Sequence, residues 1–268
     1  MQTETLDFVY KNAPLIEVIA ELRWNLIHLT AIPGGAVDPF VQQAAPRFLE
    51  RVERLGFGFV ERLLPEGVPL EMVPGQVVWR CRRAQNTWPV YQIGPGVMTC
   101  NATPPYRGWP EFRDSLAAGI EAALAAYAEA GGQISIDSFA LRYLNAFTEN
   151  EGYRDHAEFL DKELGIKIDV REEAAAKIGA SWRERMATVE QIAPIERPSG
   201  SSLIIKAGNG KKDSQPACLL ELTVRGTPQK IDQHRVWFDE ARIAIRSVFE
   251  AMLSDALKNR MGPREIAS

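Results

Sequence analysis

The sequence predicts an α+β fold in which two similar halves, each a β-α-β(3–4)-α unit, form antiparallel sheet with long helices on one face. The first observation is Leu15–His28, where apolar and polar residues alternate as in a strand buried on one side. The second is a similar pattern of residues in Phe139–Thr148, where Leu141-Arg142-Tyr143 matches Leu22-Arg23-Trp24 at an offset of 119 positions. In both, an apolar residue, an arginine and an aromatic residue follow in that order. The third is a pair of long helical patterns, each beginning near a tryptophan, 128 positions apart.

Two matches at similar offsets indicate an internal duplication. We therefore expect one half in residues 1–132 and the other in residues 133–268, packed together as one compact unit. The alternative is a chance similarity between two ordinary α+β halves.

Composition places the chain among globular proteins and excludes some partners. Of its 268 residues, 46% are hydrophobic and 25% are charged, which is the globular average. The formal net charge of −4 disfavours a general polyanion binder. The N-terminus lacks the basic start and cleavage site of a signal peptide, and no apolar run reaches the length of a membrane span. We expect a cytoplasmic protein that does not enter a membrane.

The first half begins with the strand in Leu15–His28, whose polar face carries Glu17, Glu21, Arg23 and Asn25. Asp38-Pro39 predicts the start of a helix, with Asp38 as its N-cap and an end at Gly56. Apolar and polar residues then alternate with a period near two, and turn residues divide the stretch, so four strands are predicted. These are Phe57–Leu64, Val77–Arg82, Trp88–Ile93 and Val97–Asn101. A long alanine-rich helix follows, from about Trp109 to Gly131-Gly132.

The second half repeats this order. A strand is expected in Ile134–Thr148 and a short helix in Tyr153–Leu164, followed by a charged, alanine-rich connector. Further strands are expected in Ser181–Val189, Ser201–Lys206 and Ala217–Arg225, with Gly208–Pro216 as an exposed hairpin loop. The last helix, which contains Trp237, is expected from about Asp232 to Asn259.

This order of elements is similar to the saddle-shaped sheets of TATA-binding-protein-like domains, which carry their helices on the convex face. Several stretches together also resemble a sporadically distributed family of bacterial proteins of similar length, to which no function is assigned. The stretches are Ala13–Trp24, Tyr91–Asn101, Tyr106–Trp109, Leu141–Asn145 and the helix from His234 onward. The resemblance supplies no reaction, ligand or partner. It implies one shared architecture and a role in defence, toxin neutralisation or an accessory complex.

Arg23 and Arg142 are the first candidates for a binding site. Alternation places both on the polar sheet face, opposite their aromatic neighbours. Together they could clamp a carboxylate or phosphate, because a guanidinium binds these groups through two parallel hydrogen bonds. The alternative is that each pairs with an acid on its own face, for example Arg23 with Glu17 or Glu21.

A second basic group lies in Ser181–Met186, where Arg183 and Arg185 alternate along a predicted strand and share one face. Added to Arg142, they would make that side of the second sheet basic. A solvated sheet surface with interleaved acids explains the same residues. Nucleic-acid binding would require exposed aromatic side chains among these cations, and most aromatics fall on the predicted core faces.

Catalytic and metal-binding motifs are weak. His28, His156 and His234 belong to no HxxxH or HExxH arrangement. Cys81, Cys100 and Cys218 form no CxxC pair, and strand-like apolar surroundings predict buried, reduced thiols. We expect no metal site and no cofactor.

We therefore hypothesise a non-enzymatic binding module that recognises a protein partner or a small anionic ligand on an open sheet face. Its expected site residues are Glu21, Arg23, Asn25, Arg142, Arg183 and Arg185. One alternative is a metal-dependent phosphoesterase or nuclease-like enzyme that uses His156 or His234 with nearby acids. The other is a nucleic-acid-binding saddle protein, which the acidic net charge disfavours.

Overall fold

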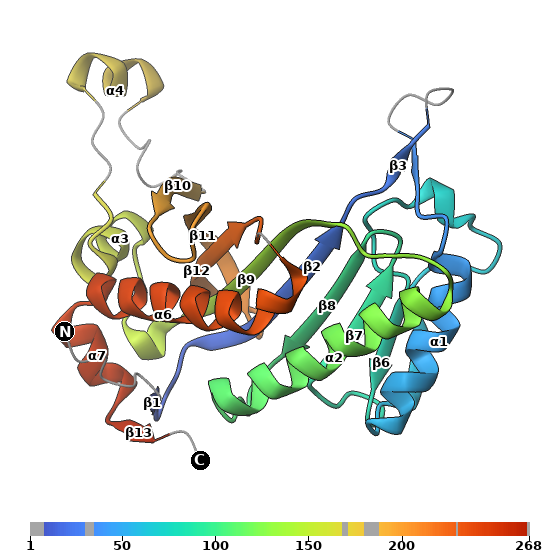
Figure 1. Cartoon of the computed structure of the whole chain (residues 1–268). Helices are drawn as coiled ribbons and strands as arrows, with labels where there is room; N and C mark the ends of the chain where they lie inside the picture. Colours follow the sequence, from blue (N-terminus) through green and yellow to red (C-terminus); the bar gives the residue numbers. More distant parts are fainter. Residues whose placement is uncertain (1–7, 30–34, 168–170, 180–187, 229, 267–268) are drawn as a thin grey trace.

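The computed structural model describes residues 8–29, 35–167, 171–179, 188–228 and 230–266. An antiparallel sheet of nine strands forms its centre (Figure 1). From one edge to the other the strands are β10 (Thr188–Ile195), β11 (Ser201–Lys212), β12 (Gln215–Gly226), β9 (Ile136–Phe147), β2 (Leu15–Trp24), β8 (Val97–Ala102), β7 (Val90–Gly94), β6 (Trp79–Arg82) and β5 (Phe59–Arg62). The fold is α+β, as the sequence predicts.

The helices and the remaining short strands complete the described chain. The helices are α1 (Val41–Arg54), α2 (Trp109–Glu129), α3 (His156–Leu164), α4 (Glu172–Ile178), α6 (His234–Met252) and α7 (Asp255–Met261). Near the chain ends, β1 (Phe8–Tyr10) pairs with β13 (Arg264–Ile266), and β3 (Ile27–His28) pairs with β4 (Ala36–Val37). No helix in the described ranges is long and apolar enough to cross a membrane.

The main core lies between the sheet and helices α1, α2 and α6, which occupy the same side of the sheet in Figure 1. On β2 the alternation predicted from sequence is confirmed, because Val18, Ala20, Leu22 and Trp24 are all buried. The facing helices contribute buried side chains that include Phe48 of α1, Ile120 of α2 and Phe238 of α6. Burial of this apolar surface is the main stabilising contribution to the layered arrangement.

Strands β2 and β9 lie side by side at the middle of the sheet and run antiparallel. On the far side of β2 the sheet continues with β8, β7, β6 and β5, and on the far side of β9 it continues with β12, β11 and β10. The stretches 119 positions apart in sequence are therefore direct neighbours in space.

Asp38 holds several elements together, in a different role from the one predicted. Helix α1 begins at Val41 with Phe40 as its N-cap, so the prediction of Asp38 as N-cap is wrong. One carboxylate oxygen accepts a hydrogen bond from the Phe40 backbone N–H at 3.1 Å. The other accepts from the Trp24 indole N–H at 2.8 Å, the Tyr127 hydroxyl at 2.6 Å and the Gly96 backbone N–H at 3.2 Å. Asp38 thus joins β2, α2 and the turn between β7 and β8.

The glycine-rich stretch from Gly208 to Pro216 is not the exposed loop that its composition predicts. Strand β11 continues to Lys212, and the hairpin turns at Asp213 and Ser214, which have φ angles of +50° and +69°. The glycines serve close packing, since a Cβ on Gly210 would lie 2.4 Å from the Leu219 side chain. The absence of a side chain therefore allows the two long strands to pair along their whole length.

Two other predictions differ from the structure. The long C-terminal helix is two helices, because the chain leaves helical geometry at Leu253 and the Ser254 hydroxyl caps α7 by accepting from the Leu257 N–H at 2.9 Å. The predicted charged connector contains α4, whose alanines favour helix. The predicted strand in Ser181–Val189 lies mostly outside the described residues, and its described part, from Thr188, belongs to β10.

The Asp38 junction yields a stability prediction. We expect Asp38→Ala to lower the free energy of unfolding by about 3 kcal/mol, because the donors of Trp24 and Tyr127 would lose their buried acceptor. Chemical denaturation followed by circular dichroism measures this value. The control is Asp161→Ala on the exposed face of α3, expected to change stability by about 0.5 kcal/mol or less. Equal stability of the two variants would contradict the role assigned to Asp38.

Candidate functional site

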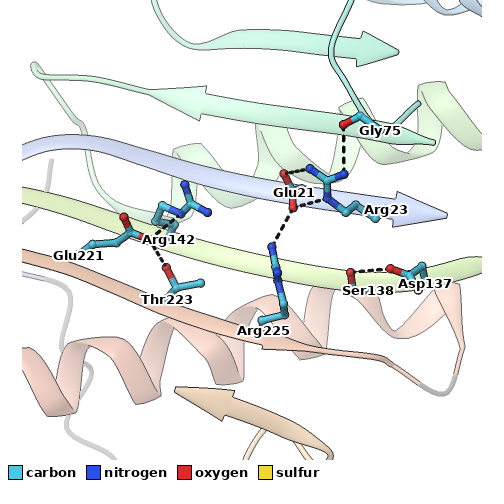
Figure 2. A network of polar contacts seen from close by, with 9 residues as sticks. All are labelled: Glu21, Arg23, Gly75, Asp137, Ser138, Arg142, Glu221, Thr223 and Arg225. Carbon is cyan, nitrogen blue, oxygen red and sulfur yellow. Dashed lines mark hydrogen bonds and ion pairs between the residues drawn. The ribbon is translucent and has the colours of Figure 1, made fainter. Parts of the chain in front are cut away.

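The candidate site is the sheet face turned away from α1, α2 and α6, which we call the open face. It is formed by the side chains of each strand that alternate with the core residues, and Figure 2 shows its central part on β2, β9 and β12. Its polar side chains include Arg80, Gln92, Thr99, Asn101, Glu17, Glu21, Arg23, Arg142, Glu221, Thr223 and Arg225. Three arginines on it, Arg23, Arg142 and Arg225, keep 34%, 36% and 47% of their side-chain surface exposed.

The register of the sheet places one row of residues straight across all nine strands. From β5 to β10 the row is Glu61, Arg80, Gln92, Thr99, Glu21, Ala140, Arg225, Ser202 and Pro194. Acidic, basic and neutral polar side chains therefore follow one another across the face instead of forming a block of one charge.

Glu21 lies at the centre of this row and binds two arginines. Its carboxylate accepts two hydrogen bonds from Arg23, from Nε at 2.8 Å and from Nη2 at 3.0 Å. Arg23 also donates through Nη1 to the Gly75 carbonyl oxygen at 3.1 Å. From the other side, Nη2 of Arg225 reaches the same carboxylate at 3.5 Å, across the small side chain of Ala140 (Figure 2). The pKa of Arg23 is raised, chiefly by its hydrogen bond to Glu21.

Arg142 belongs to a second ion pair. Its Nε lies 3.1 Å from Oε1 of Glu221, which also accepts a hydrogen bond from the Thr223 hydroxyl at 3.1 Å. Glu221 and Thr223 come from β12, the neighbour of β9, so this pair ties two adjacent strands together (Figure 2).

Arg23 and Arg142 share the open face, and each has its own carboxylate. Arg23 lies opposite Ser138 and Arg142 opposite Ile19, so the two arginines are four positions apart along the paired strands, about 13 Å. The geometry matches the ion-pair alternative stated above, in which Arg23 pairs with Glu21. A small anion would have to displace carboxylates to be held by both guanidiniums.

The other predicted site residues fall in different places. Asn25 follows the end of β2, where its Nδ2 donates to the Ser135 hydroxyl at 3.2 Å. Among the described residues, the Asn25 side chain donates to Ser135 and Ile136 and makes no hydrogen bond to Arg23, Arg142 or Arg225. Arg183 and Arg185 lie outside the described residues, so their contribution stays a prediction.

A chain of hydrogen bonds continues on the same side of the sheet toward β6, where Gln92, Thr99 and Asn101 are buried. With the Gln92 amide oriented so that its oxygen faces Arg80, that oxygen accepts from Nε at 2.8 Å and from Nη2 at 3.0 Å. The amide nitrogen then donates to Thr99, the Thr99 hydroxyl donates to Asn101 at 2.7 Å, and Asn101 donates to Glu17 at 2.8 Å. Gln92, Thr99 and Asn101 each accept one hydrogen bond and donate another, which fixes these side chains in place.

Sequence reasoning missed Arg80, Gln92, Glu221 and Arg225 as members of this surface. The available signal was alternation, since Glu221, Thr223 and Arg225 occupy every second position of a predicted strand. Their partners follow from strand order and register, which the sequence alone did not provide.

His156 and His234 each lie in the first turn of a helix. His156 is the first residue of α3 and is buried, which lowers the pKa of its imidazole, while Asp155 caps the helix by accepting from the Glu158 N–H at 2.8 Å. Nδ1 of His234 lies 2.9 Å from the Ile231 carbonyl oxygen. Within the described ranges, no group of three or more His, Cys, Asp or Glu side chains is placed to hold a metal ion.

Comparison with protein-family models, with curated proteins and with solved structures finds no match to this chain.

The cysteines yield a reactivity prediction. All three are free and buried, as the sequence predicts. Burial raises the pKa of Cys81 and of Cys218 to about 12, and also raises that of Cys100. At pH 8 the folded protein should release almost no thionitrobenzoate from Ellman's reagent, whereas the unfolded protein should release three equivalents. A thiol that reacts within minutes in the native protein would reveal a nucleophile that this structure does not contain.

Proposed function

We propose that the protein is a non-enzymatic binding module that recognises another protein on the open face. The observation that carries the proposal is the row of interspersed acidic, basic and neutral side chains across the sheet, on the side away from α1, α2 and α6. Fixed, paired charges on a broad surface favour recognition of one complementary surface, because a mismatched partner would leave charges unpaired.

The charge pattern supports a protein partner over a small anion or a nucleic acid. A phosphate backbone on this face would meet the carboxylates of Glu21 and Glu221 beside the guanidiniums of Arg23 and Arg142, which costs affinity. Apolar surface is also present, since Ile192 of β10 is 63% exposed in the row that contains Arg142. Protein interfaces combine apolar anchors with paired polar groups in this way.

We infer that the open face arose by duplication of one half, 1–132, into a second, 133–268, and that the sheet has the saddle form of TATA-binding-protein-like domains. In support, β2, α1, the strands β5 to β8 and α2 follow in the same order as β9, α3, the strands β10 to β12 and α6. In each half the opening strand pairs with the last strand of its own meander. Glu21 and Ala140 are also 119 positions apart, and they lie opposite each other on β2 and β9. Arg23 and Arg142 lie two positions from this pair, one on each side, as a two-fold relation between the halves would place them.

We further propose that the protein acts in the cytoplasm as part of a defence or accessory complex. Three free, buried thiols support a reducing compartment. The family resemblance described above supports the proposal of a complex.

Charge removal on the open face tests the proposal. The full chain, immobilised, should capture a partner protein from its native host, and Arg23→Gln with Arg142→Gln should reduce that capture at least tenfold, as expected for lost charged hydrogen bonds. The fold should survive, because each half-exposed pair contributes about 1 kcal/mol or less. The matched control is Arg154→Gln, an exposed arginine beyond the end of β9, which should capture the partner normally.

Two further measurements separate the rival functions. A protein-binding module should turn over no phosphodiester or nucleotide substrate, with or without divalent metal ions. It should also give no steeply salt-dependent shift with nucleic acid at low salt. Turnover would support the phosphoesterase, a salt-dependent shift would support the nucleic-acid-binding saddle, and unchanged capture by the double variant would remove the open face as the site.

A further inference from the structure

Strand β5 forms one edge of the nine-stranded sheet, and in the described chain it has β6 as its one ladder partner. Directly after the strand, the Leu63 backbone N–H donates to the Val78 carbonyl oxygen at 2.8 Å and continues the β5–β6 register. In an antiparallel ladder the backbone groups of successive residues turn alternately to the two sides. The N–H and C=O groups of Val60 and Arg62 therefore turn away from β6, toward the outer edge.

Apolar side chains flank this outer edge. Leu55 at the end of α1, Phe59 and Val60 in β5, and Leu63 after the strand are each more than a third exposed. Val60 lies on the core side, opposite the buried Cys81 of β6, and Phe59 lies on the side of the open face. Clusters of exposed apolar side chains mark interaction surfaces. A row of backbone donors and acceptors between such side chains fits an added β-strand.

The charged side chains of β5 are held over β6 instead of guarding the edge. Glu61 accepts a hydrogen bond from Nε of Arg82 at 2.8 Å. The Arg62 guanidinium lies 5.8 Å from the ring centre of Trp79, its neighbour on β6. Natural sheets protect their edges with outward charges or with proline, which cannot donate to an added strand. The opposite edge strand, β10, contains Pro194, whereas β5 contains no proline.

We propose that β5 pairs antiparallel with β5 of a second copy of this chain, about a two-fold axis perpendicular to the sheet. The same surface then serves both copies, as in most homodimers. Backbone hydrogen bonds would hold the two strands together, and the flanking apolar side chains would add buried area. The two sheets become one, and the open faces of the two copies adjoin. The proposal does not rest on the function proposed for the open face.

The register of this pairing follows from the residues of β5. Residues directly opposite each other in an antiparallel pair lie on the same side of the sheet, so the two-fold axis must pass through a residue pair and not between two. With Glu61 on the axis, two carboxylates would lie opposite each other, which is destabilising. With Val60 on the axis, each valine faces its counterpart through its outward backbone groups, and Phe59 lies opposite Glu61.

Sedimentation equilibrium of the full chain between about 1 and 100 µM tests the proposal. This range brackets the roughly micromolar Kd expected for a strand of four residues. The mass should rise from that of one chain to that of two. Val60→Pro should weaken the dimer at least tenfold, because each copy loses an outward N–H while the β5–β6 ladder bonds remain. Circular dichroism checks that the variant folds.

A second variant and a matched control complete this experiment. If Val60→Pro fails to fold, Val60→Lys keeps the backbone N–H and places two like charges at the axis, so it should weaken the dimer at least tenfold as well. The control is Ile243→Lys, which puts the same charge at an exposed apolar position of α6. Helix α6 packs on β9 and β12, away from β5, so this variant should dimerise as the wild type does.

Cysteine cross-linking tests the register directly. The three native cysteines are buried, so an added thiol on β5 is the accessible one. Paired residues on the axis have Cα atoms about 5.5 Å apart, within the range of a disulfide, and Val60→Cys should therefore give a covalent dimer under mild oxidation. Arg62→Cys would place its two thiols four positions apart, about 13 Å along the strands, and should stay uncoupled.

Four outcomes would overturn the proposal. These are a wild type that stays monomeric at about 100 µM, a monomer that binds a strand of another protein through β5, a dimer that neither Val60 variant weakens, and coupling through Arg62→Cys without coupling through Val60→Cys. The variant with both Arg23→Gln and Arg142→Gln should dimerise normally. Failure of the open face as a binding site is therefore distinguishable from failure of the dimer.

Discussion

The antiparallel pairing of β2 with β9 is the constraint on which the rest of the structure depends. It brings Leu22-Arg23-Trp24 beside the strand that carries Leu141-Arg142-Tyr143, although the two segments are separated by more than a hundred residues. Because side chains alternate along each strand, the same pairing sends Trp24 into the core and the two arginines to the open face. A slip of one position would exchange the two faces.

The two sides of the sheet hold their charges in different ways. On the open face the guanidiniums of Arg23, Arg142 and Arg225 are partly exposed and have carboxylate partners, as in Arg23 with Glu21 and Arg142 with Glu221. Under α6 the guanidiniums of Arg242 and Arg246 are buried beside tyrosine rings, and Arg246 pairs with Glu250 at 3.0 Å. Exposed, mutually paired charges suit recognition of a broad surface.

The sequence predicts much of the fold and little of the site. Alternation identifies the two faces of β2 and β9, and the turn and cap residues locate most strands and the helix α2. Arg225 could not be assigned to Glu21 because that contact crosses β9 and needs both the strand order and the small side chain of Ala140. Composition predicts Gly208–Pro216 as a loop, but Gly210 is needed in a strand for close packing against Leu219. Here the packing of one strand against its neighbour, and not the loop propensity of glycine, decides the local structure.

The central claim, that the open face is the surface by which this protein binds its partner, is most directly tested by arginine footprinting. An arginine-selective dicarbonyl reagent, applied to the free protein and to the captured complex, reports which side chains become covered. We predict that Arg23, Arg142 and Arg225 lose reactivity in the complex, while Arg107 and Arg235 on the helical side keep it. Protection of Arg107 and Arg235 with undiminished labelling of the open-face arginines would contradict the account.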